Sequence, residues 1–105
     1  MKSLDSIRSQ LAAGAIRFSE HAFTRLVERK ISVREIRAAG LRGIVIEDYP
    51  ADKYGPTSLL LGITAEGRAL HFQVSRRESD MVKIITVYEP DPGEWADNFS
   101  RRKRL

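Results

Sequence analysis

The sequence TSLLLGITAEGRALHFQVSRRESDMVKIITVYEP, from Thr57 to Pro90, decides the fold of this chain. It contains three apolar runs that are separated by two polar turns, at Glu66-Gly67 and at Glu78-Ser79. Short apolar runs bounded by Gly and polar residues are typical of β-strands joined by hairpin loops. We therefore predict a three-stranded antiparallel meander.

The side chains of this meander divide between two faces, because neighbouring residues of a strand point to opposite sides of a sheet. With two-residue turns, one face is apolar and should be covered by helices; it collects Leu59, Leu61, Ile63, Leu70, Phe72, Val74, Ile85 and Val87. The other face is mixed; it collects Ser58, Leu60, Gly62, Thr64, Ala69, His71, Gln73, Ser75, Val82, Ile84, Thr86 and Tyr88. A turn one residue longer would exchange the faces of a strand.

On the mixed face, His71 and Tyr88 are the side chains most typical of a functional site. The assumed register places His71 opposite Gly62 and Thr86, and Tyr88 opposite Ala69. We therefore expect an imidazole and a phenol on an uncovered, water-accessible surface. The alternative is that His71 is a hydrogen-bonded structural residue and that Tyr88 covers the edge of the sheet.

The length of 105 residues favours one domain over residues 1–105, with a core that needs no cross-links. The chain has no Cys, which excludes disulfides and thiolate metal sites. No apolar run approaches the roughly 20 residues of a membrane span. Asp5, Arg8 and Gln10 interrupt any signal-peptide core. We expect a cytoplasmic protein that does not bind membranes.

The net charge of +4 is distributed unevenly along the chain. Residues 1–42 carry nine basic and four acidic side chains, and residues 43–100 carry five basic and ten acidic ones. Residues 100–105 form a basic tail that we expect to be mobile. A positive region of this kind is suited to nucleic acid. The alternative is that basic helices simply face water above an acidic sheet.

Three helices are predicted before the meander, over residues 3–13, 20–30 and 33–41. The first predicted helix begins at Ser3, and the other two follow Ser19 and Ser32; all three serines can cap a helix. Ser32 and Glu35 match the capping box. Their spacing predicts an inward-facing side for each helix, formed by Leu4, Ile7, Leu11, Ala22, Phe23, Leu26, Val27, Val33, Ile36 and either Ala39 or Gly40.

A fourth strand is predicted from Ile44 to Tyr49, before Pro50. The spacing of Trp95 and Phe99 predicts a short helix over residues 93–99 that docks on the core. The elements together predict an α+β fold, in which N-terminal helices pack on one face of a small twisted antiparallel sheet of about four strands, followed by a short C-terminal helix.

His21, Arg25 and Arg29 recur every four residues in the second predicted helix and therefore form a row on it. Adjacent cations destabilise an isolated helix, so we expect an anion to compensate them. An RNA phosphate is one candidate. The alternative is that the arginines pair with acidic side chains of the chain itself, such as Glu28, Glu47 or Glu89.

Four stretches then resemble a known family: FSEHAFTRLVERKIS, IEDYP, SLLLGITAEGRALHF and IITVYEPDPGEW, which together span about Phe18 to Trp95. They resemble the bacterial domain-of-unknown-function family 4258, which is similar to the RelE-like and MqsR-like ribonuclease toxins. The resemblance implies helices on one side of a small antiparallel sheet. It also implies a partner, a cognate antitoxin that carries a zinc finger and a helix-turn-helix.

We therefore expect a metal-independent endoribonuclease toxin that acts on mRNA, including mRNA on the ribosome. Such cleavage needs a base, an acid and cations for the phosphate charge. The expected catalytic residues are His71, His21, Arg25, Arg29 and Tyr88. The expected RNA-contacting residues are Arg68, Lys53, Tyr54, Gln73, Arg101 and Arg102.

No cofactor and no metal is expected, because Asp48, Asp52, Glu89 and Asp91 do not form a spaced ligand motif. Two other functions remain open. The chain could be a non-catalytic RNA- or protein-binding module of the same fold, or a degenerate toxin that only docks its antitoxin.

Overall fold

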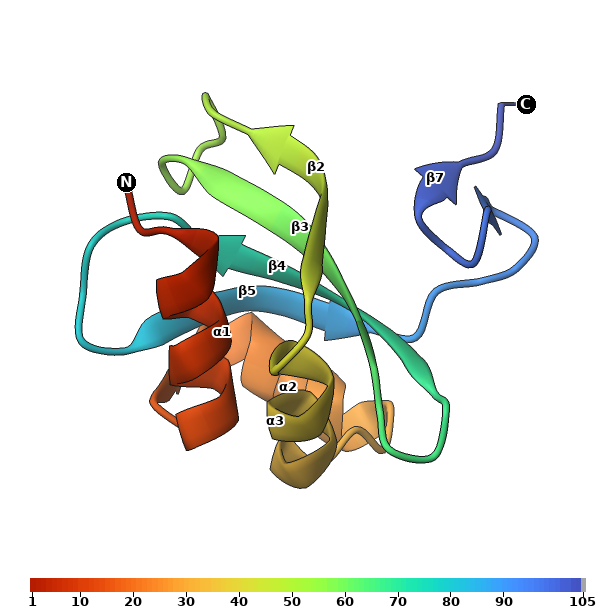
Figure 1. Cartoon of the computed structure of the whole chain (residues 1–105), viewed down its shortest axis with the longest axis horizontal. Coiled ribbons are helices and arrows are strands. Elements are labelled where there is room, and N and C mark those ends of the chain that lie inside the picture. The colour runs from red at the N-terminus through yellow and green to blue at the C-terminus, as the bar shows by residue number, and fades with distance from the viewer. Residues whose placement is uncertain (105) are drawn as a thin grey trace.

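The computed structural model describes residues 1–104 and contains a five-stranded sheet with three helices on one side. The helices are α1 (Leu4–Ala13), α2 (Glu20–Glu28) and α3 (Val33–Gly40). The sheet contains β1 (Ile16–Phe18), β2 (Ile44–Tyr49), β3 (Thr57–Ile63), β4 (Ala69–Ser75) and β5 (Val82–Tyr88). Figure 1 shows the C-terminal segment, with β6 (Trp95–Ala96) and β7 (Arg101–Arg102), on the side away from the helices.

The strands lie in the order β1-β5-β4-β3-β2. All neighbours are antiparallel except β1, which runs parallel to β5. The α+β class and the β3–β4–β5 meander are confirmed, but the purely antiparallel sheet of about four strands was wrong. The missed strand, β1, has only three residues, which is too short to show an alternating pattern.

The three helix starts are confirmed. The hydroxyls of Ser3, Ser19 and Ser32 each accept a hydrogen bond from the backbone N–H three residues later, and Glu35 completes the capping box at α3. α1 ends at Gly14, whose φ is 75°. The longest of these helices has ten residues, and none of those described within residues 1–104 has the length and apolarity to cross a membrane.

α2 ends two residues earlier than predicted. The N–H of Ile31 donates to the Leu26 carbonyl at 2.9 Å and that of Lys30 to the Val27 carbonyl at 3.2 Å. These two bonds form a Schellman motif, which needs a left-handed residue after the helix. Lys30 fills that position with a φ of 54°.

The loop between β3 and β4 is one residue longer than the assumed two-residue turn. Its ends are closed by a hydrogen bond from the Thr64 N–H to the Arg68 carbonyl at 2.8 Å, and Gly67 has a φ of 87°. His71 therefore lies opposite Leu61 and not Gly62. The extra residue exchanges the faces of β3, so that the core receives Leu60, and the other face receives Leu59, Leu61 and Ile63.

A register shift between Gln73 and Val74 changes the prediction for β5 as well. Tyr88 lies directly opposite His71 rather than Ala69, and Val74 lies opposite Ile84. The predicted neighbours of β5 were therefore wrong, and two residues predicted on the mixed face are in the core, Val82 and Ile84.

The core lies between the helices and the sheet, and two glycines allow its layers to approach closely. A Cβ at Gly40 would lie 2.5 Å from the Cβ of Leu11, and a Cβ at Gly62 would lie 2.3 Å from the carbonyl oxygen of Ala39. Both distances are shorter than any normal contact, so α3 packs directly on α1 and on β3 only because these positions lack a side chain.

The inward face of the helices is narrower than predicted. Phe23 and Val27 are 59% and 62% exposed, and Val33 is 44% exposed. α2 lies along the edge of the sheet, where the Ser19 N–H donates to the Ile84 carbonyl at 3.1 Å. A helix at an edge is covered on one side only, so Ala22 and Leu26 alone of the predicted α2 stripe are buried.

The predicted C-terminal helix was wrong. Asp97, Asn98 and Phe99 have φ values of 53°, 55° and 67°, which are left-handed and incompatible with an α-helix. They form a turn that brings β7 back to pair with β6. The first part of the predicted mobile tail is therefore a strand, while Leu105 lies outside the described residues. We call residues 90–104 the C-terminal strap.

Candidate functional site

The His71 imidazole is the centre of a polar cluster on the sheet face away from the helices. The residue is 0% exposed. Its Nε2 lies 2.8 Å from the carbonyl oxygen of Phe99 and its Nδ1 lies 3.1 Å from the hydroxyl of Tyr88. The Trp95 indole packs edge-on against it, with ring centroids 4.4 Å apart. The predicted uncovered surface was therefore wrong at His71, because the strap covers it.

The hydrogen-bond partners of His71 define its tautomer. A carbonyl oxygen can only accept, so Nε2 carries the proton, and Nδ1 accepts from the Tyr88 hydroxyl. Burial lowers the pKa of His71, although the bond to Phe99 and the charge of Glu47 oppose this. Burial also raises the pKa of Tyr88. The pair is therefore neutral near pH 7, with an imidazole in the form that a general base requires.

Glu47 and Arg102 form the second part of this cluster. Arg102 Nε donates to Glu47 Oε2 at 2.9 Å, and the guanidinium lies over the Trp95 ring at 4.7 Å. The Tyr49 hydroxyl also donates to Glu47. Burial opposes ionisation of Glu47, but the bonds from Tyr49 and Arg102 outweigh it and hold its pKa below the usual value. Glu47 and Tyr49 were not predicted as site residues, because only the pairing of β2 with β3 brings them to the His71 cluster.

The predicted cationic row of α2 does not join the cluster. Arg29 Nη1 donates to the Val87 carbonyl at 2.7 Å, and Arg25 pairs with Glu28 at 3.0 Å. His21 is exposed beside Arg25 in a shallow surface groove. α2 packs on the helix-covered side of the sheet, whereas His71 lies on the other face. The predicted arrangement, an imidazole and two guanidinium groups around one hollow, is not formed.

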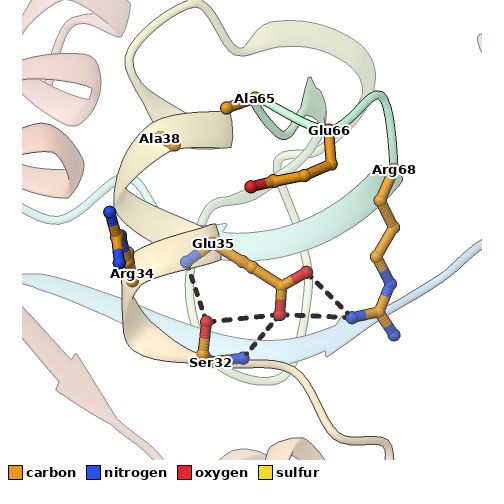
Figure 2. Close-up of a pocket in the computed structure, with 7 residues that line it drawn as sticks. All are labelled: Ser32, Arg34, Glu35, Ala38, Ala65, Glu66 and Arg68. Atoms are coloured by element: carbon orange, nitrogen blue, oxygen red, sulfur yellow. Dashed lines mark hydrogen bonds and ion pairs between the residues drawn. The ribbon is translucent and has the colours of Figure 1, made fainter.

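Arg68, predicted to bind phosphate, is held by the protein itself. Its guanidinium contacts Glu89 at 2.8 Å and Glu35 at 3.0 Å, and it also donates to the carbonyls of Arg29 and Lys30. Figure 2 shows Arg68 and Glu35 meeting at the groove between α3 and the β3–β4 loop. Nε and both terminal nitrogens therefore already have acceptors, so this fork is not free for a phosphate.

The remaining predicted RNA-contacting residues have separate contacts. Lys53 Nζ lies 5.1 Å from the ring centroid of Tyr54 in the exposed β2–β3 loop. Gln73 Nε2 donates to Thr57 Oγ1 at 3.0 Å, and Arg101 pairs with Asp97 at 2.7 Å. Three of the predicted site residues come together in the structure. His71 contacts Tyr88 directly, and Trp95 contacts both His71 and Arg102.

A second candidate site lies on the helices. Arg34 and Arg37 line a groove of about 380 Å³ between α1 and α3, together with Leu41. Arg8 Nε donates to the Gly43 carbonyl at 2.8 Å, next to Arg42 in the chain. We call Arg8, Arg34, Arg37 and Arg42 the α1–α3 arginine surface.

This arginine surface forms few ion pairs within residues 1–104. Within residues 1–104, Arg8 is the one member that forms an ion pair, with Asp5 at 3.9 Å, while Arg34 also lines the groove that contains Glu35 and Glu66. Arg37 donates to the Ala12 carbonyl, a neutral acceptor, at 3.0 Å. The sequence shows the excess of positive charge in residues 1–42. It does not identify these four arginines as one surface, because the packing of α1 against α3 is a tertiary contact.

The ammonium group of Lys2 is a buried charge that the sequence pattern did not identify. The residue is 1% exposed, and Nζ donates to Gln10 Oε1 at 2.6 Å and to Ser79 Oγ at 2.9 Å. Burial lowers its pKa. These contacts tie the N-terminus to the β4–β5 loop, which is a structural role. Among residues 1–104, no three His, Asp or Glu side chains are grouped to hold a metal ion.

The fold and the cluster define a small α+β domain whose sheet is covered by helices on one face and by the strap on the other. The chain belongs to the domain of unknown function family DUF4258, whose family model matches residues 18–89. α1 and the strap lie outside the matched residues. No curated protein and no solved structure matches the chain.

Proposed function

We propose that this protein binds single-stranded RNA through the α1–α3 arginine surface, as a non-catalytic module while the strap is closed. The observation that carries the proposal is that Arg34 and Arg37 line one groove, that Arg42 is exposed just after α3, and that none of the three forms an ion pair within residues 1–104. Guanidinium groups match phosphate geometry and supply most of the affinity for a nucleic-acid backbone. The choice of RNA rests on the resemblance to ribonuclease toxins.

The absence of catalysis in this state is supported by the contacts of the expected catalytic groups. Both ring nitrogens of His71 are hydrogen-bonded, and no part of the residue is exposed. Arg29 is bound to the backbone of β5 and lies on the other side of the sheet. A phosphate at the arginine surface would therefore meet cations without meeting the imidazole.

The test is fluorescence anisotropy with a labelled single-stranded RNA over a range of salt concentrations. The double variant Arg34→Glu/Arg42→Glu should bind at least about tenfold more weakly, and its salt slope should fall by about 1.4, because two single-strand phosphate contacts are lost. The matched control is Arg17→Glu/Lys83→Glu, which makes the same charge change on exposed residues of β1 and β5. Equal losses in both variants would contradict a defined surface.

A second function is favoured by the His71 cluster. We propose that displacement of the strap exposes a metal-independent endoribonuclease site. The neutral imidazole of His71 would take the proton of a ribose 2′-hydroxyl, whose oxygen would attack the adjacent phosphorus as the bond to the 5′-oxygen breaks, and Tyr88 or water would protonate that leaving oxygen. Arg102 belongs to the strap and moves away with it, so a cation outside the strap would stabilise the phosphate charge. The observation that carries this proposal is the direct contact of His71 with Tyr88, beneath a strap that lies outside the family match.

This second function is tested by RNA cleavage with Trp95→Ala, which removes the ring that packs on His71. Cleavage should rise in Trp95→Ala relative to the natural chain and disappear in Trp95→Ala/His71→Ala. If hydrogen exchange shows the strap open in Trp95→Ala and RNA stays intact, the nuclease proposal fails while the binding proposal stands. An antitoxin remains a proposed partner, checked by co-purification with the product of a neighbouring gene.

A further inference from the structure

An apolar patch on the outer face of α2 has no role in the RNA proposals. Phe23 and Val27 are 59% and 62% exposed, and they lie four residues apart, on successive turns of one face of the helix. The half-buried ring of Phe18 contacts Phe23 edge-on, with centroids 6.4 Å apart. Large apolar side chains that gather on one face of a short helix mark an interaction surface more often than isolated ones do.

Two opposite charges bracket this patch. Glu20 is the first residue of α2, and Lys30 follows its C-terminal end. Both are exposed, and neither takes part in an ion pair within residues 1–104. Glu20 and Lys30 lie five residues before and after Arg25, and Phe23 and Val27 lie two residues before and after it. The patch and its flanking charges are therefore symmetric about the middle of the helix.

We infer that α2 forms the contact between two copies of this chain, which pack with their α2 helices antiparallel. A two-fold axis that crosses the Phe23–Val27 face at the middle of α2 places Phe23 against Val27 of the partner subunit, and Glu20 against Lys30 of the partner subunit. A two-fold contact requires a surface that is complementary to itself, and this pattern of charges meets that requirement. Arg25 lies two residues from both Phe23 and Val27, so it is on the other side of α2, where it pairs with Glu28, and the contact does not oppose two arginines.

The size of the patch sets the strength of the dimer. A stable protein interface buries at least about 1,200 Å² in total, and one helix face with two large apolar side chains supplies only part of that area. The dimer is therefore a weak one, with a dissociation constant in the micromolar range or above, at about 1 μM to 1 mM. Its population depends strongly on protein concentration.

The test is sedimentation velocity at increasing concentrations with a charge exchange. Glu20→Lys alone opposes two cations at each end of the contact, and Lys30→Glu alone opposes two anions. Each single variant should weaken association by at least about tenfold. The double variant Glu20→Lys/Lys30→Glu restores opposite pairs and should associate within about threefold of the natural chain. The matched control, Glu66→Lys on the β3–β4 loop, should leave association unchanged.

A second variant addresses the apolar part of the contact. Phe23→Ser removes an exposed ring, so it should abolish the dimer and leave the folded monomer intact by circular dichroism. The inference is overturned if the natural chain stays monomeric up to about 1 mM. It is equally overturned if the single charge variants associate like the natural chain, or if the double variant is as weak as either single one.

Discussion

The two faces of the sheet are covered in different ways. On one face, the completely buried side chains of Leu60, Phe72 and Val87 pack beneath the helices. On the other face, His71 is covered by a strap through one hydrogen bond to Phe99, one indole contact and the Arg102–Glu47 ion pair nearby. The first cover depends on apolar area, which is non-directional, and the second depends on a few directional contacts.

The difference implies two levels of stability in one small domain. Loss of the helix-covered face removes the core and therefore unfolds the chain. Loss of the strap exposes a mixed face, on which Leu59 and Leu61 lie beside polar side chains, and leaves that core in place. Regions with few buried apolar contacts open at a lower free energy than the whole molecule does. We therefore expect strap opening and global unfolding to respond separately to mutation.

The largest effect is expected on the helix-covered face. Phe72→Ala removes a completely buried ring from the core and should lower the free energy of unfolding by about 3–5 kcal/mol. Urea denaturation measures this loss. A cost below about 1 kcal/mol would show that the helices do not provide the main core.

A smaller global effect is expected from Trp95→Ala, although Trp95 is a larger side chain. Its ring packs against His71 in the closed strap only, so the global loss cannot exceed the free energy of strap opening. The amides of residues 95–103 should exchange hydrogen at least about tenfold faster, and those of β3 and β4 should not change. Trp95→Phe, which keeps an aromatic ring, is the control. Uniformly faster exchange across the sheet would contradict two separate levels.

Acid should weaken the strap-covered face selectively. Burial lowers the pKa of His71 from 6.5 in the closed chain. At pH values between that lowered pKa and 6.5, the open or unfolded chain therefore binds more protons than the closed one. The stability contributed by neutral His71 is therefore present above pH 6.5 and is lost as pH falls below it. Hydrogen exchange of the strap from pH 7.5 to 5.5 measures the trend. His71→Gln keeps a polar side chain and should lack this pH dependence; an unchanged slope would exclude His71 as its source.

The smallest effects compare two left-handed residues, one in each cover. Lys30→Gly at the end of α2 should raise the free energy of global unfolding by about 0.5–1 kcal/mol, because glycine adopts a positive φ without strain. Asn98→Gly should slow exchange in the strap by a comparable free energy, about 0.5 kcal/mol, and leave global unfolding unchanged. The same response from both variants would mean that strap and core open together.

The parts of the fold that depend on local chemistry were predictable from the sequence. Ser3, Ser19 and Ser32 cap their helices through bonds that span three residues, and the apolar runs of the meander are contiguous in the chain. The faces of β3 were wrong because they depend on one additional loop residue, and neither Ala65 nor Glu66 has a side chain that specifies the loop length.

The site was less predictable, because its contacts join distant segments. Arg68 carries the guanidinium expected of a phosphate ligand, but the fold brings Glu35 and Glu89 to it. His71 was identified as a central residue, yet the carbonyl that binds it belongs to Phe99, in a left-handed turn of non-glycine residues. Asp97 and Asn98 are residue types that adopt positive φ, but three such residues in a row ending at Phe99 are rare, so no sequence spacing predicts this turn.

The position of α2 also affects how the sheet meets other molecules. Beyond the end of the three-residue edge strand β1, the carbonyls of Ile84 and Val87 on the outer side of β5 already accept hydrogen bonds from Ser19 and Arg29. An incoming strand would find these acceptors occupied. Sheet extension is thereby directed to β2, where an irregular register and the adjacent acidic pair Glu47 and Asp48 discourage it. The domain is therefore expected to resist edge-to-edge aggregation along β2 and along the part of β5 that β1 leaves uncovered.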